Sequence, residues 1–297
     1  MIVPKPLKYN DTIGIAAPSA SFYIDPLNKG IAVLKEMGFR VEVPDAIFEK
    51  KRYLAGNDKQ RAQVFEDLLI RDDIQAIICA RGGFGSIRML PFIETSLANI
   101  TPKKIIGFSD ITPILNYFAL RYNWVTFHGP VVTMLADADQ LTIESLYMSL
   151  TESLPKQMPH SRNIKILSQG NYQQEVVGRI WGGNLATLCH TIGTPFFIDC
   201  QDGLLFLEDR GEVLYKIDRM MTQMRLAGCF KNVKGVLLGT FKDCGNINKI
   251  HDVILECFDY DIPVYANYQC GHNLPNYTFP IGCAARLSNG IVEILSE

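Results

Sequence analysis

The first half of the chain alternates between short apolar runs and longer amphipathic segments. Thr12 to Ala16, Ile74 to Cys79 and Ile105 to Phe108 are the apolar runs, and their continuity indicates strands buried on both faces. The segment after the first run has apolar residues at helical spacing, at Leu27, Ile31, Leu34 and Met37. This spacing predicts a helix that ends at Gly38.

The same alternation continues to about residue 150. Further strands are expected at 40–43 and 125–127, and further helices at 58–69, 111–120 and 141–150. Strands that alternate with helices are typical of a parallel sheet covered by helices. The first half is therefore predicted to be an α/β domain with a parallel sheet.

The second half has a more mixed pattern. Strands are expected at 176–181, 204–207, 236–238 and 264–266, a helix at 213–224, and a hairpin of 284–287 with 291–295 around Ser288-Asn289-Gly290. Between the halves, the segment that starts at Leu154 has two prolines and few apolar anchors. We expect an N-terminal domain over 1–153, a linker over 154–170, and a C-terminal domain over 171–297.

Composition excludes several classes of protein. The chain has 297 residues, 47% of them apolar and 20% charged, with a net charge of −2, so a nucleic-acid partner is not expected. No apolar run approaches the roughly 20 residues of a membrane helix, and the first residues do not resemble a secretion signal. We expect a cytoplasmic protein. Its eight cysteines form no C-x-x-C pair and its five histidines show no ligand spacing, so we expect no metal and no cofactor.

Ser109 lies where a strand is expected to turn into a helix, in Gly107-Phe108-Ser109-Asp110-Ile111. A serine at such a turn projects its hydroxyl from the backbone, and the helix amides can stabilise a developing negative charge. The segment resembles the nucleophile elbow G-x-S-x-G, with Ile111 in place of the second glycine. The alternative is a serine that caps the helix.

A serine nucleophile needs a base and a group that orients the base. His272 lies in a turn-rich loop after a strand, where catalytic side chains often stand, although it could simply hydrogen-bond within that loop. His128, at the end of a neighbouring strand, competes for the role. Glu208 and Asp209 end an apolar strand and point to opposite faces, so only one of them can face the histidine; the alternative is a solvated acidic turn.

The oxyanion hole requires free backbone amides. Gly82 and Gly83 follow a strand, and the amide of Asp110 follows the nucleophile, so the amides of Gly83 and Asp110 are the expected donors. A glycine-rich loop can also bind phosphate. The segment from Arg81 to Gly85 matches neither phosphate-loop nor dinucleotide motif, so a nucleotide site is the weaker interpretation.

Together these segments resemble the LD-carboxypeptidase family of serine peptidases. Five blocks carry the resemblance, in the family's order and over almost the whole chain: Asp11 to Ser19, Arg81 to Gly85, Gly107 to Thr112, Gly182 to Leu185 with Gly193 to Pro195, and Leu207 to Glu212 with Tyr215 to Arg219.

The resemblance implies a triad in which Ser109 is the nucleophile, His272 the base and Glu208 the residue that orients it. It favours His272 over His128. It also implies a flavodoxin-like N-terminal domain, a smaller mixed β/α C-terminal domain, and an active site in the groove between them. The implied substrates are cytoplasmic murein tetrapeptides, cleaved before a terminal D-alanine in peptidoglycan recycling, and a homodimer is expected.

A carboxypeptidase must also bind a free carboxylate, which an arginine can do with charge-assisted hydrogen bonds. The residues expected to bind substrate are Arg81, Gly82, His128, Trp181 and Asn184. Arg210 stands where a small or apolar residue is expected, and its charge could alter substrate preference. Two alternatives remain: a self-immunity peptidase that cleaves peptidyl-nucleotide antibiotics, and a non-enzymatic two-lobed ligand-binding protein.

Overall fold

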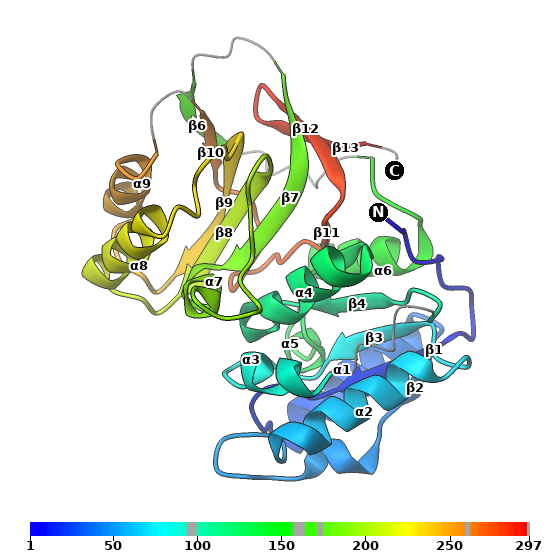
Figure 1. Ribbon diagram of the computed structural model, residues 1–297. Coiled ribbons are helices and arrows are strands. Elements are labelled where there is room, and N and C mark those ends of the chain that lie inside the picture. The colour runs from blue at the N-terminus through cyan, green and yellow to red at the C-terminus, as the bar shows by residue number, and fades with distance from the viewer. Residues whose placement is uncertain (94–99, 157–163, 171–174, 259–261, 296–297) are drawn as a thin grey trace.

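Two β-sheets organise the protein, each with helices packed against it (Figure 1). The structure is a computed structural model that describes residues 1–93, 100–156, 164–170, 175–258 and 262–295. We call the first sheet with its helices the first lobe, and the second sheet with its helices the second lobe. None of the described helices is long and apolar enough to cross a membrane.

The strands and helices are as follows. The strands are β1 (Thr12–Ala16), β2 (Arg40–Glu42), β3 (Ala76–Cys79), β4 (Lys104–Gly107), β5 (Thr126–His128), β6 (Lys165–Gln169), β7 (Val176–Asn184), β8 (Leu204–Arg210), β9 (Gly235–Lys242), β10 (Pro263–Ala266), β11 (Phe279–Ile281), β12 (Ala284–Ser288) and β13 (Ile291–Ile294). The α-helices are α1 (Ile24–Glu36), α2 (Asp58–Ile70), α3 (Ser86–Met89), α4 (Thr112–Tyr122), α5 (Val132–Leu135), α6 (Gln140–Thr151), α7 (Leu185–Thr191), α8 (Leu214–Leu226) and α9 (Ile247–Leu255).

The first sheet has the strand order β2-β1-β3-β4-β5, all parallel, with β11 added beside β5. Alternate residues of each strand enter different cores: Ile13 and Ile78 pack with α1 and α5, whereas Ile77 and Ile105 pack with α2 and α4. Helices therefore cover both faces, as the continuous apolar runs predict. The expected flavodoxin-like arrangement is confirmed.

β11 brings a segment of the second half into the first sheet. It pairs antiparallel with β5, with Phe279 opposite His128, and forms the edge of the sheet. Pro280 is compatible with this position because an edge strand has one side without ladder hydrogen bonds. The sequence pattern did not predict this strand, since a three-residue segment that contains proline gives no strand signal.

The second sheet is mixed, as expected. Its order is β13-β12-β7-β8-β9-β10-β6, and β7 to β10 run parallel whereas β6, β12 and β13 pair antiparallel. β6 lies within residues 154–170, where only a linker was expected, and it pairs with β10. Residues 157–163 of that expected linker lie outside the described residues. Figure 1 shows α8 and α9 together on one side of this sheet.

Buried hydrogen bonds join α4 of the first lobe to β7 of the second. The side chain of Asn116 donates to the carbonyl of Gly182 at 2.9 Å and accepts from the Gly182 amide at 3.0 Å. The hydroxyl of Thr112 accepts from the amide of Asn184 at 3.0 Å. α4 begins three residues after Ser109, so these bonds fix the second lobe relative to the predicted nucleophile.

Candidate active site

Ser109 occupies a strained turn between β4 and α4. Its φ is +60°, a left-handed conformation that costs a non-glycine residue about 1–3 kcal/mol. A short 3-10 helix, Ser109–Ile111, leads into α4, and no side chain caps either helix. Ser109 is therefore not a helix cap, and its half-buried side chain stands at the carboxyl end of the first sheet.

The side chain of Asp110 holds this turn in place. Its Oδ2 atom accepts hydrogen bonds from the Ser19 hydroxyl at 2.5 Å and from the Ser86 amide at 2.9 Å. Burial raises the pKa of Asp110, and the bonds from Ser19 and Ser86 oppose that rise. Asp110 thus ties the loops after β1 and β3 to the turn. Sequence reasoning assigned a role only to its amide, because the partners are distant in the chain.

His272 and Glu208 form a direct contact. The Nδ1 atom of His272 lies 2.7 Å from Oε2 of Glu208, which ends an apolar stretch of β8 and is fully buried. An ionised carboxylate can only accept a hydrogen bond, so in a bond to ionised Glu208 the donor is Nδ1 of His272. Gly271 permits this approach, because a Cβ atom there would lie 2.6 Å from Glu208 Oε2.

Asp209, the neighbour of Glu208, has a different task. The pairing of β8 with β9 shifts register between Leu207 and Asp209. Asp209 accepts hydrogen bonds from the side chain of Asn184 at 3.0 Å and from the amide of Ala186 at 2.9 Å, at the start of α7. Burial raises its pKa to about 6. The two acids therefore separate into one that contacts histidine and one that holds a helix.

The loop that carries His272 is anchored to the first lobe. The Gly271 amide donates to the side chain of Asn276 at 2.8 Å, and the Asn276 amide donates to the hydroxyl of Thr142 on α6, also at 2.8 Å. The loop then enters β11, two strands away from β4. The imidazole packs on Phe108, with ring centroids 4.7 Å apart. The position of His272 is thus tied to the sheet that carries Ser109.

Ser109 and His272 share a pocket between the lobes, which we call the interlobe pocket. Its volume is about 430 Å³, and its lining residues are Arg81, Gly82, Gly83, Phe108, Ser109, Val131, Thr133, Met134, Asp137, Arg210, Lys242, His272 and Leu274. A Cβ atom on Gly82 would lie 3.1 Å from that of Ser109 and 3.5 Å from the Asp110 amide nitrogen. The glycine loop after β3 therefore passes directly beside the serine.

His128 is not part of this pocket. It is fully buried, and its ring packs against Phe108, Phe206 and Phe279. Burial lowers its pKa to about 4, because the charged form would be desolvated. His128 is therefore neutral at pH 7 and does not line the interlobe pocket, contrary to its expected place among the substrate-binding residues.

Trp181 and Asn184 are also not brought to the interlobe pocket. Trp181 is 7% exposed and belongs to the core. Asn184 is buried at the start of α7, where its side chain accepts from the Thr187 amide at 3.0 Å and donates to Asp209. Both were expected to line the groove from the family resemblance, but Trp181 packs in the core and the side chain of Asn184 caps α7. Of the expected substrate-binding residues, Arg81 and Gly82 line the pocket.

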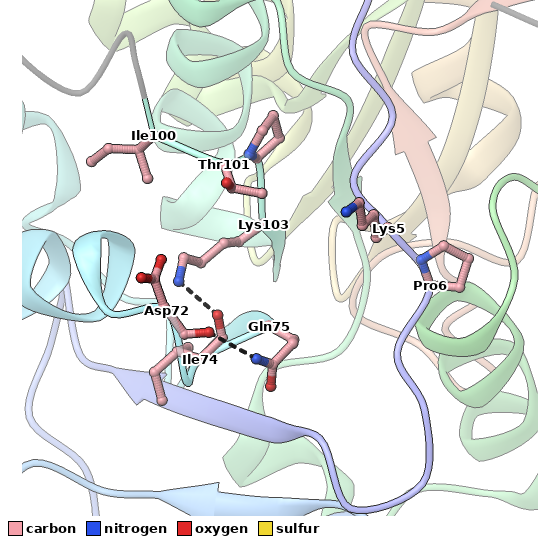
Figure 2. Close-up of a pocket in the computed structure, with 9 residues that line it drawn as sticks. Lys5, Pro6, Asp72, Ile74, Gln75, Ile100, Thr101 and Lys103 are labelled. Atoms are coloured by element: carbon pink, nitrogen blue, oxygen red, sulfur yellow. Dashed lines mark hydrogen bonds between the residues drawn. The ribbon is translucent and has the colours of Figure 1, made fainter.

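A smaller hollow lies at the opposite, amino end of the first sheet (Figure 2). Its volume is about 240 Å³. Figure 2 shows that its polar groups bond to one another: the ammonium of Lys103 donates to the Ile74 carbonyl at 2.6 Å, and Gln75 donates to the Asp72 carbonyl at 3.0 Å. No serine, cysteine or histidine is among the described residues that line this hollow, so it lacks the residue types that Ser109 and His272 bring to the interlobe pocket.

Comparison with known proteins agrees with this geometry. Residues 13–129 match the LD-carboxypeptidase N-terminal domain, and residues 177–287 match the LD-carboxypeptidase C-terminal domain. The chain is 33% identical to a probable murein peptide carboxypeptidase of Bacillus subtilis, over 96% of this chain and 91% of that protein. It is 29% identical to the microcin C7 self-immunity protein MccF of Escherichia coli, over 95% and 91%.

A solved structure has the same fold as this chain. The crystal structure of an MccF-like protein from Bacillus anthracis superposes with a TM-score of 0.91 and 26% identity, covering all of both chains. The similarity therefore extends over both lobes and not only over the region around Ser109.

Proposed function

Because this chain belongs to the LD-carboxypeptidase family, we propose that it is a serine carboxypeptidase that removes the terminal D-alanine from murein tetrapeptides during peptidoglycan recycling. The observation that carries the proposal is the contact between Glu208 and His272 at the pocket that also contains Ser109. These three residue types are the parts that acyl transfer requires.

The proposed reaction starts with attack by the Ser109 hydroxyl on the carbonyl of the last peptide bond. His272 accepts the serine proton at Nε2, and Glu208 stabilises the imidazolium that forms. His272 then gives this proton to the nitrogen of the leaving D-alanine. Water hydrolyses the acyl-enzyme on Ser109 with His272 again as the base, which restores the free enzyme.

The amides of Gly83 and Asp110 are the proposed oxyanion donors. A Cβ atom on Gly82 would lie 3.2 Å from the Oγ atom of Ser109, so the glycine lets the loop pass close to the serine. Gly83 has a φ of +109°, a conformation that favours glycine. A Cβ at Gly83 would also lie 2.6 Å from the Cβ of Ala20. Such fixed donors stabilise the tetrahedral intermediate without needing to reorganise.

Arg81 is proposed to bind the terminal carboxylate of the substrate. It lines the interlobe pocket beside the glycine loop, and its guanidinium donates to the Ser21 carbonyl at 2.8 Å, which leaves further donors available. Arg88, by contrast, is used in an ion pair with Asp58 at 2.7 Å.

A second candidate function comes from the similarity to MccF, a self-immunity protein. Cleavage of a peptidyl-nucleotide would require a surface on which the base can stack. Among the described residues that line the interlobe pocket, the aromatic rings are those of His272, the proposed base, and Phe108, which is 5% exposed and packs on His272. This favours a peptide without a nucleobase.

The test is to offer the purified protein an L,D-linked tetrapeptide, its L,L isomer and an aminoacyl sulfamoyl adenosine. We expect release of D-alanine from the first peptide alone, and loss of release in Ser109→Ala. Hydrolysis of the nucleoside compound alone would replace the proposed substrate with that of the second candidate. Full activity of Ser109→Ala would rule out the proposed mechanism.

A further inference from the structure

Two cations stand side by side at the second-lobe wall of the interlobe pocket. Arg210 ends β8 and Lys242 ends β9, and the two residues are direct partners in the parallel pairing of these strands. Both line the interlobe pocket. Like charges directly opposite each other on neighbouring strands are destabilising, so this pair needs an explanation.

Nearby acids do not balance the pair. Arg210 lies 3.6 Å from Asp243, but both side chains are more than half exposed, and such pairs contribute little. The lining of the pocket holds three cations, Arg81, Arg210 and Lys242, against one carboxylate, Asp137. The pocket is therefore cationic in a protein whose net charge is −2.

One cation is enough for the terminal carboxylate of a peptide, and Arg81 is proposed for that task from the first lobe. Arg210 and Lys242 reach the pocket from the opposite lobe, so they face a different part of the substrate. An arginine fork binds a carboxylate with two parallel hydrogen bonds, and a neighbouring ammonium adds a third charge-assisted donor. A bound anion would also remove the repulsion between the two cations.

We propose that Arg210 and Lys242 form a second anion subsite, which selects peptides with an additional side-chain carboxylate close to the scissile bond. This inference rests on the proposed function, because it takes the substrate to be a peptide in the interlobe pocket. It identifies Arg210 and Lys242 as specificity-determining residues, with no part in proton transfer.

The test measures binding by the Ser109→Ala variant, so that hydrolysis does not interfere. Two probes are L-Ala-γ-D-Glu-L-Lys-D-Ala and the same peptide with meso-diaminopimelate in place of lysine, since these side chains differ by one carboxylate. We expect calorimetry to show about tenfold tighter binding of the diaminopimelate peptide. The additional changes Arg210→Gln and Lys242→Gln should reduce this preference to below about twofold.

A charge-matched control is Ser109→Ala with Lys231→Gln and Lys234→Gln. These exposed lysines precede β9, at the opposite end of the strand from Lys242. The control should keep the preference. Equal affinity for the two peptides, binding of neither, or equal loss of preference in the control would overturn the inference.

Adenosine monophosphate, added as a competitor, distinguishes a phosphate from a side-chain carboxylate. Displacement of the peptide by this nucleotide through Arg210 and Lys242 would assign the pair to phosphate and overturn the carboxylate assignment. Hydrolysis by the wild-type protein is scored separately. If the binding preference is present but neither peptide is cleaved, the proposed function fails and the subsite stands.

Discussion

The two ends of the first sheet contain similar residue types in different states. At the amino end, the ammonium of Lys104 is fully buried and donates to the carbonyls of Ser149 and Glu152 at 2.7 and 2.9 Å, and Lys103 likewise bonds to backbone carbonyls. At the carboxyl end, Ser109 stands in a strained turn, and Nδ1 of His272 contacts Glu208.

The difference separates polar groups that bond to the backbone from polar groups that face a pocket. At the amino end the ammonium groups of Lys103 and Lys104 bond to backbone carbonyls, so they hold the chain together. At the carboxyl end, the bonds of Asp110 hold the turn and Glu208 contacts Nδ1 of His272. Ser109 and His272 both line the interlobe pocket. The following predictions test this contrast, in order of decreasing effect on turnover.

The largest effect is expected for His272→Ala. Loss of the base should lower kcat by about 10⁵–10⁶-fold, because the members of a triad act as a unit. The measurement is D-alanine release from the L,D-tetrapeptide, with circular dichroism as a check on folding. A folded variant that keeps more than about a tenth of the activity would show that the carboxyl end is not the reactive end.

Glu208→Gln should lower kcat by about 10³–10⁴-fold, because the neutral amide cannot stabilise an imidazolium. The matched variant is Asp209→Asn, which should lower the free energy of unfolding by about 1–2 kcal/mol through its weaker bonds to α7. Its kcat should change by less than about tenfold. Both quantities are measured on the same preparations, and an exchange of these two outcomes would reverse the roles assigned to the neighbouring acids.

His128→Gln should change kcat by less than about tenfold, since the buried ring does not reach the pocket. It should alter acid stability. The folded-state pKa of His128, about 4, lies below its ordinary value of 6.5, so between these values the unfolded state binds more protons. Relative to the variant, the wild type should lose up to about 3 kcal/mol as the pH falls from 6.5 to 4.

Denaturant titrations of both proteins at each pH measure this difference. A constant difference in the free energy of unfolding would mean that His128 does not titrate as a buried neutral group. A loss of turnover as large as that of His272→Ala would restore His128 as the base.

Lys104→Met should leave kcat unchanged within about twofold, because Lys104 lies at the amino end. Burial lowers the pKa of Lys104 from 10.5 to about 8. Between pH 8 and 10.5 the unfolded state therefore binds more protons, and the wild type should gain stability relative to the variant as the pH rises. Unfolding curves at pH 8, 9 and 10 provide the check. A rate defect without a change in stability would contradict the assignment of this end to stability.

Much of the first lobe follows from the sequence because its signals are local. The apolar runs at β1, β3 and β4 predict buried strands, and the abrupt change after Phe108 predicts the turn at Ser109. The histidine at 272 could be proposed from its turn-rich loop. The choice between His272 and His128 could not be made from the residues, because it depends on which ring is enclosed by phenylalanines from three distant strands and turns.

Other features depend on pairings that have no local signal. The pairing of β8 with β9 shifts register between Leu207 and Asp209, and this register places Arg210 beside Lys242. Trp181 lies within β7 and packs in the core, whereas Asn184 ends β7 and caps α7. β6 and β11 were not predicted, because whether such short segments form strands depends on their pairing with neighbouring strands in the sheet.

The strand β11 has a consequence for modular exchange between relatives. A fragment that stops at residue 153 would leave β5 as an open edge, exposed to pairing with other copies. A chimera that joins the first half of one relative to the second half of another imports His272, its loop and the strand β11 together. Recombination at the midpoint therefore has to preserve the pairing of β5 with β11 as well as the contacts between the lobes. A crossover after residue 281 would keep β5 and β11 from the same relative.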